Sequence, residues 1–308
     1  MKARFYFHEE AIRCNAKDSK EDYIRKFSSF IKDISHIIHE DFEEHEFVSS
    51  YNLFGINVFE NQNIYEFASG NLDSDTMKIL CIVLGNLSEN TNLDRNEIEE
   101  LTIYNPTEEV CHVLFDLNHH TEDDRNKPYM QFDKYELIYN HNSWLTVRRQ
   151  ILGNHPESAS NFMKRAKVYF PDINFSDNCE HVVGQYLTAV PRKIVYYLSC
   201  MNDHLFKFWE SHPNKKDINQ ICAEFAGNYK MDRAGSMQGK PEDKEKYSFE
   251  FKTKAGIKVV CCGPHFKITS PDDNYAGPDV HQGDSYHPRI YFNKEDGCIV
   301  VGSIGPHL

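Results

Sequence analysis

The chain has 308 residues, of which 40% are hydrophobic and 13% aromatic, and its formal net charge at pH 7 is −13. This apolar content is typical of a folded protein rather than a disordered one. The negative charge disfavours nonspecific binding to duplex nucleic acid, which requires clustered Lys and Arg to neutralise phosphates. No apolar run approaches the roughly 20 residues of a membrane-spanning helix, and the first ten residues lack a secretory h-region, so we expect a cytoplasmic protein without membrane contact.

The distribution of charged residues and the spacing of the cysteines each indicate something about the protein. Residues 221–308 carry 11 Lys and Arg against 12 Asp and Glu, so most of the excess acidity lies in residues 1–220. An acidic front region either faces a basic partner or keeps the protein soluble. Nine cysteines, an odd number, are scattered without a Cys-x-x-Cys pair, which favours free thiols and gives no zinc-ribbon signature.

The first 120 residues show the pattern of a small, acidic α+β region. Residues 2–7 alternate apolar and polar side chains as an opening strand would. Residues 18–21 offer helix-capping chemistry before an amphipathic helix whose apolar side chains recur from Tyr23 to Ile38. Three further elements are expected: a strand near residues 54–59, a helix or strand over 77–87, and a strand over 110–117.

A linker and a helical region follow. Residues 118–128 are polar and turn-rich, which predicts the best domain boundary in the chain. The pattern over 128–216 is helical, and the expected helices cover residues 142–152, 158–170 and 181–209, the last interrupted at Pro191.

The last region, residues 217–308, predicts an antiparallel β-sheet domain preceded by a helix over 217–229. A charged loop is expected over 231–246, and the expected strands are 247–252, 257–262, 265–268, 289–292 and 299–304. The last two strands, joined by a short turn with Asp296-Gly297, predict a β-hairpin. The fold class is therefore α+β, with an N-terminal α+β region, a central helical region and this C-terminal sheet domain.

The C-terminal region concentrates side chains suited to RNA chemistry, namely His265, Lys267, Arg289, Tyr291 and His307. A helix followed by a compact antiparallel sheet, with a late Arg-x-Tyr strand, resembles the small RelE/HigB-like ribosome-dependent RNA-cleaving toxins over roughly the last 80 residues. Members of that family are usually small and basic, whereas this chain is about three times their size and acidic.

The resemblance implies RNA cleavage without a metal or other cofactor. Lys267 and Arg289 would stabilise charge on the phosphate, while His307 or Tyr291 would act as acid or base. RNA or the ribosome would then be the target, and an antitoxin or a defence-system subunit the protein partner. We therefore expect a toxin-like or phage-defence protein.

Three alternatives remain open at this point. Glu250-x-Lys252 preceded by Asp243 is similar in outline to the metal-binding motif of PD-(D/E)XK nucleases, in which two carboxylates hold Mg²⁺. A zinc site could combine Cys261, Cys262 or His265 with a histidine at position 281, 287 or 307, although adjacent cysteines on a strand point to opposite faces. The third alternative is a non-catalytic, partner-binding subunit whose terminal hairpin adds an edge strand to a partner's sheet.

Overall fold

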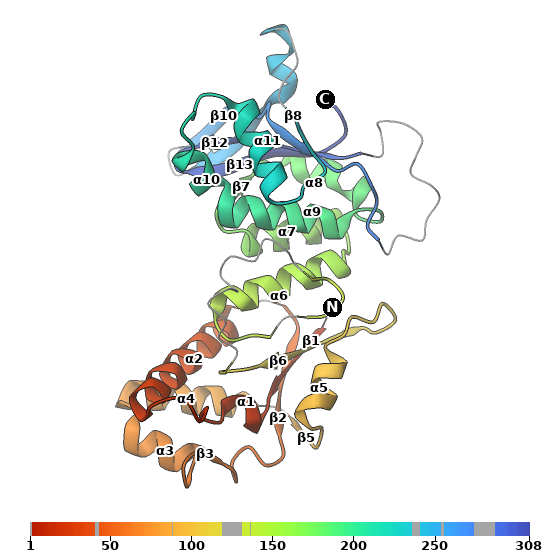
Figure 1. Ribbon diagram of the computed structural model, residues 1–308. Helices are drawn as coiled ribbons and strands as arrows, with labels where there is room; N and C mark the ends of the chain where they lie inside the picture. Colours follow the sequence, from red (N-terminus) through yellow and green to blue (C-terminus); the bar gives the residue numbers. More distant parts are fainter. Residues whose placement is uncertain are drawn as a thin grey trace. The chain divides into compact units, whose positions relative to one another are not determined.

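The computed structural model describes residues 2–40, 43–87, 89–118, 131–135, 137–235, 241–253, 256–273 and 287–308. The chain forms two compact units, Met1–Ile151 and Leu152–Leu308, which we call unit 1 and unit 2 (Figure 1). The predicted α+β class, with a largely antiparallel sheet at the C-terminal end, is confirmed. Within the described ranges, no helix is both long and apolar enough to cross a membrane.

This division differs from the three predicted regions, 1–120, 128–216 and 217–308. The predicted linker at 118–128 lies, apart from Asn118, outside the described residues. Most of the predicted helical region joins the C-terminal sheet in unit 2, because β7 (Ile173–Phe175) lies among those helices and pairs in parallel with β13 (Cys298–Gly305). A short strand thus ties the helices to the sheet.

Unit 1 alternates strands with helices. Its strands are β1 (Lys2–Phe7), β2 (His45–Ser50), β3 (Asn57–Phe59), β4 (Gln62–Asn63), β5 (Glu89–Thr91) and β6 (Val110–Phe115). Its helices are α1 (Glu9–Ile12), α2 (Lys20–Glu40), α3 (Ile64–Asn71), α4 (Ser74–Gly85), α5 (Arg95–Leu101) and α6 (His141–Asn154), the last of which continues past the unit boundary.

The main sheet of unit 1 has the order β5-β2-β1-β6, and every pair is parallel. Alternate side chains of β1 enter the two layers of core. On one face, Phe5 and Phe7 contact Phe115, and Phe7 also contacts the ring of Phe30 on α2. On the other face, Tyr6 packs in a cluster with Ile98 of α5. Figure 1 shows α2 and α4 on one side of this sheet and α5 on the other. Parallel strands require such crossovers, and the helices cover both faces.

One expectation for unit 1 is wrong, and one strand of its main sheet was not expected. The strand expected near residues 54–59 is mainly a turn, and only Asn57–Phe59 forms a short strand. The sheet strand is instead β2, whose sequence HEFVSS shows little alternation of its own. Pairing with β1 and β5 on both sides places His45–Ser50 in the sheet despite its weak local preference.

Unit 2 begins with helices and ends with strands. Its helical elements are α7 (Ala159–Tyr169), α8 (Asn178–Val183), η2 (Gly184–Tyr186), α9 (Pro191–Cys200), the π-helical η3 (Met201–Leu205), α10 (Phe206–Ser211), α11 (Ile218–Asn228) and η4 (Pro241–Tyr247). Its strands, besides β7 and β13, are β8 (Arg233–Gly235), β9 (Ser248–Thr253), β10 (Gly256–Cys261), β11 (His265–Lys267) and β12 (Arg289–Glu295). Pro191 opens α9 rather than kinking a longer helix, since proline suits the first helical position.

A five-stranded sheet of order β7-β13-β12-β11-β8 forms the centre of unit 2. Its helix side is apolar: Phe266 contacts Phe225 of α11, and Phe292 contacts Trp209 of α10. The β9–β10 hairpin packs on the other side, in a cluster that contains Phe251, Val260 and Tyr291. The predicted turn between β12 and β13 is present, with positive φ at both Asp296 and Gly297. That combination matches the hairpin turn whose twist suits flanking strands.

Candidate active site

Four of the five predicted site residues lie on one face of the unit 2 sheet. In the β11–β12 pair, His265 is opposite Tyr291 and Lys267 is opposite Arg289. Because strand side chains alternate, residues two apart on each strand share a face. This face looks toward the β9–β10 hairpin, and His307 follows the end of β13 beside it.

His265 is half-buried between Tyr291 and the edge strand β8. Its Nδ1 lies 3.2 Å from the backbone oxygen of Gly263. A carbonyl oxygen only accepts, so Nδ1 carries the proton and the neutral ring keeps its lone pair on Nε2. Nε2 faces Gly235, where an added Cβ would stand 2.7 Å away. The imidazole can occupy this position only because residue 235 is a glycine, which has no side chain.

The charge around His265 favours the neutral imidazole. Burial lowers the pKa of His265, and the positive charges of Arg289, His307 and Lys267 lower it further. A histidine with a lowered pKa is unprotonated at neutral pH and can accept a proton. The four residues are thus close enough to act on one another electrostatically.

Tyr291 and Arg289 are much less accessible than the prediction required. Tyr291 is only 1% exposed and Arg289 5%. The Tyr291 hydroxyl accepts a hydrogen bond from the backbone N–H of Leu308 at 3.1 Å, and the Tyr247 hydroxyl donates to the Leu308 oxygen at 3.3 Å. Burial raises the pKa of Tyr291, which opposes its use as a base. Tyr291 therefore positions the imidazole and the chain after β13.

Of the five predicted site residues, His265, Lys267 and His307 have side chains open to solvent. His265 and Lys267 are half-buried, and His307 is exposed. Beneath them Ser303, opposite Tyr291 on β13, is fully buried, and its hydroxyl has no hydrogen-bond partner among the described residues. Sequence reasoning missed Gly235, Tyr247 and Ser303. Gly235 lies in a stretch that was predicted as a loop. The glycine itself was the one sign in the sequence that another group approaches the backbone there.

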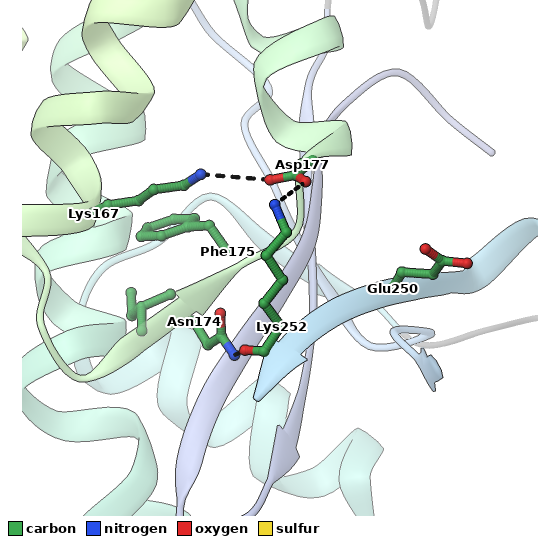
Figure 2. A pocket seen from close by; sticks show the side chains of 7 residues that line it. Lys167, Asn174, Phe175, Asp177, Glu250 and Lys252 are labelled. Carbon is green, nitrogen blue, oxygen red and sulfur yellow. Dashed lines mark hydrogen bonds and ion pairs between the residues drawn. The ribbon is translucent and has the colours of Figure 1, made fainter. Parts of the chain in front are cut away.

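The alternative nuclease motif lies at a separate pocket of about 290 Å³ (Figure 2). The pocket is lined by Lys167, Ile173, Asn174, Phe175, Asp177, Glu250 and Lys252. Lys252 Nζ is 2.8 Å from one carboxylate oxygen of Asp177, and Lys167 Nζ is 3.6 Å from the other. The bond from Lys252 holds the pKa of Asp177 below its usual range.

This arrangement does not assemble the carboxylate pair that the metal-nuclease alternative needs. Figure 2 shows the Glu250 carboxylate directed away from Asp177. The Asp243 side chain lies outside the described residues. Lys252 is instead held by Asp177, a partner 75 residues away that the motif did not include.

The zinc alternative is not supported by a cluster of metal-binding side chains among the described residues. Within the described part of the chain, no group of three or more His, Cys, Asp or Glu side chains could hold a metal ion. Cys262 is buried in the apolar cluster, and burial raises the pKa of its thiol. All nine cysteines are unbridged. His281 lies outside the described residues.

The terminal hairpin is not an edge of the sheet. β13 lies between β7 and β12, and β12 lies between β13 and β11. Among the described residues the edge strands are β7 and β8. β7 covers β13 only over Ile299–Val301 and β11 covers β12 only over Arg289–Tyr291, so strand addition by a partner at the rest of the hairpin stays a prediction.

Known proteins provide no further guide to this site. A scan against protein-family models and searches of curated proteins and solved structures found no match. The resemblance to RelE/HigB-like toxins is therefore neither supported nor opposed by relatives.

Proposed function

We propose that unit 2 binds RNA and cleaves it without a metal ion, with His265 as the base. The observation that carries this proposal is the half-buried imidazole of His265 on the same sheet face as Lys267, with its Nδ1 3.2 Å from the Gly263 oxygen. Burial lowers the pKa of this imidazole. RNA cleavage by its own 2′-hydroxyl requires a base, an acid and positive charge near the phosphate. His265, His307 and Lys267 offer these three functions on one side of the sheet.

The reaction follows from those roles. His265 Nε2 takes the proton of the 2′-hydroxyl, and the 2′-oxygen forms a bond to the adjacent phosphorus. The bond from phosphorus to the 5′-oxygen breaks, and protonated His307 gives that oxygen its proton. The products are a 2′,3′-cyclic phosphate and a 5′-hydroxyl. Lys267 stabilises the negative charge on the non-bridging phosphate oxygens, and buried Arg289 adds to the positive potential from below.

The setting that we propose is toxin-like or defensive, in which such cleavage stops growth of the host cell. The test is to incubate the purified chain, with and without ribosomes, with end-labelled RNA in the presence of EDTA. We expect fragments that end in 2′,3′-cyclic phosphate, and at least a tenfold slower reaction for His265→Gln and for His307→Gln. His39→Gln, an exposed histidine on α2, is the matched control and should react as the wild type does.

Two results would overturn the proposal. One is intact RNA under every condition, together with normal growth of cells that express the chain. The other is cleavage that persists unchanged in His265→Gln and His307→Gln, which would locate the activity elsewhere. Circular dichroism of each variant separates loss of chemistry from loss of fold.

A further inference from the structure

Unit 1 carries a long stretch of uniformly negative sequence. Residues 33–77 contain ten Asp and Glu and no Lys or Arg. The same stretch exposes three large aromatic side chains, those of Tyr51, Phe54 and Tyr65, with exposed fractions of 71%, 40% and 46%. We call these three residues the aromatic patch. Exposed aromatic rings grouped on one segment are a common feature of binding surfaces.

The exposure of the patch is fixed by the residues around it. Leu53 and Ile64 are fully buried, and each is the chain neighbour of a patch residue. Backbone bonds from Leu53 N to Ser50 O and from Gly55 N to Asn52 O close the turn that holds Phe54. Tyr65 lies in the first turn of α3, behind the Asn63 capping box. The aromatic side chains therefore point outward from well-anchored backbone.

Two of the rings stack on each other and remain partly exposed to solvent. The Phe54 and Tyr65 rings stack with centroids 5.6 Å apart and planes inclined by 17°. Each ring covers part of one face of the other, and an electron-rich outer face that stays exposed attracts a cation. Their planar shape also suits the flat guanidinium group of arginine.

The charged residues nearest to the patch along the chain are acidic. Glu66 follows Tyr65 on α3, and Glu60 lies at the turn between β3 and β4, against which α3 packs. Both side chains are exposed, and Glu66 Oε2 accepts the hydrogen bond from the Asn63 backbone N–H that closes the capping box. Such a surface repels phosphates and anionic lipid and attracts Lys and Arg.

We propose that the aromatic patch binds a protein partner through an arginine- or lysine-bearing segment. Arg and Lys side chains of the partner lie over the exposed rings, and Glu60 and Glu66 supply the longer-range attraction. Arginine is preferred to lysine, because its guanidinium stacks on a ring as well as carrying charge. This surface belongs to unit 1 and is independent of the RNA chemistry proposed for unit 2.

The test uses fluorescein-labelled peptides of five Arg-Gly or five Lys-Gly repeats and the full chain, with binding followed by anisotropy. We expect the Arg peptide to bind more tightly than the Lys peptide and to lose affinity as salt rises. Tyr51→Leu/Tyr65→Leu keeps apolar side chains but removes two rings, and should weaken the Arg peptide about fivefold or more. Tyr51→Ala/Tyr65→Ala should weaken the Arg peptide to the same extent as the Leu double variant. Glu60→Gln should lower the affinity for the Arg peptide mainly at low salt.

Ile103→Ala, at a side chain of unit 1 that is 56% exposed, is the matched control and should bind as the wild type does. Equal affinity of the wild type and both double variants would overturn the proposal, because binding would then be general electrostatic attraction. Failure of the Arg peptide to bind would also overturn it. Concentration-dependent dimerisation that Tyr51→Leu/Tyr65→Leu abolishes, without peptide binding, would assign the patch to a second copy of the chain instead.

Discussion

His265 and Tyr291 face each other across β11 and β12, with ring centroids 5.0 Å apart. The hydroxyl of the same tyrosine accepts a hydrogen bond from the Leu308 backbone. One side chain thus connects the imidazole to the segment that carries His307. A change that shifts either ring should therefore alter the fold and the proposed chemistry together.

Gly235→Ala should displace the His265 ring. The new Cβ would lie 2.7 Å from Nε2, and the ring has little room to retreat because Tyr291 packs on its other side. We expect a loss of roughly 1–3 kcal/mol in the free energy of unfolding, as for other overpacked sites. Urea denaturation measures this change. By NMR, the pKa of a displaced, better-solvated His265 should rise toward its usual value.

Gly227→Ala is the control for that substitution. Gly227 lies within α11, and nothing stands within 4 Å of the position of its Cβ. The alanine should stabilise the helix by up to about 1 kcal/mol. Equal effects of the two substitutions would contradict the predicted contact between residue 235 and the imidazole.

Ser303→Ala should be neutral or stabilising. The buried Ser303 hydroxyl lacks a partner among the described residues, so its removal relieves a desolvation cost of roughly 1 kcal/mol. Thermal and urea unfolding of the purified variant check the sign. Ser199→Ala is the contrast, since the Ser199 hydroxyl donates to the Val195 oxygen at 2.8 Å. A clear destabilisation by Ser303→Ala would show that this hydroxyl has a partner after all.

Asp272 should make the stability of unit 2 depend on pH. Its carboxylate accepts hydrogen bonds from the backbone N–H groups of Arg192 and Lys193 at 2.8 and 3.1 Å. Burial nevertheless raises its pKa from 3.8 to about 6. Because the folded state holds the proton more tightly, the contribution of Asp272 is fully present below pH 3.8 and is lost as the pH rises through 6.

The measurement compares the wild type with Asp272→Asn by urea denaturation between pH 4 and 7. As the pH rises from 4 to 7, the unfolding free energy of the wild type should decrease by about 1–3 kcal/mol relative to that of Asp272→Asn. Asparagine is expected to destabilise the start of α9 at every pH, since its NH₂ group cannot accept a backbone bond. A difference that stays flat from pH 4 to 7 would rule out the raised pKa.

Arg95→Met should destabilise unit 1 strongly. Arg95 donates to Asp116 at 2.6 Å, and the Asp116 side chain is almost completely buried. Without the guanidinium the buried carboxylate keeps a hydrogen bond from the Asn118 backbone N–H but loses its countercharge. We expect a loss of roughly 3 kcal/mol, measured by chemical denaturation.

Arg25→Met supplies the comparison. Arg25 pairs with Asp22 at a similar distance, 2.7 Å, but its side chain is 77% exposed. An exposed pair of this kind is worth at most about 1 kcal/mol. Similar small losses for both variants would mean that Asp116 is better solvated than its burial indicates.

Much of the secondary structure could be predicted where a local signal is strong. The alternation in β1, the helical spacing in α2 and the Asp296-Gly297 turn all correspond to observed elements. The sequence left open whether Lys267, His265 and Arg289 lie near one another, and it is the pairing of β11 with β12 that brings them together. β2 could not be found in this way, because His45–Ser50 becomes a strand through pairing on both sides.

The sequence by itself determined the α+β class, the local elements with a strong signal, such as β1 and α2, and the choice of candidate residues in unit 2. Only the tertiary structure decided that Tyr291 and Arg289 are buried, that Lys252 is held by Asp177, and that the terminal hairpin lies inside its sheet. The physical reason is range: turn chemistry, capping and periodicity act between residues a few positions apart. Burial and charge pairing are set by residues brought together from distant parts of the chain.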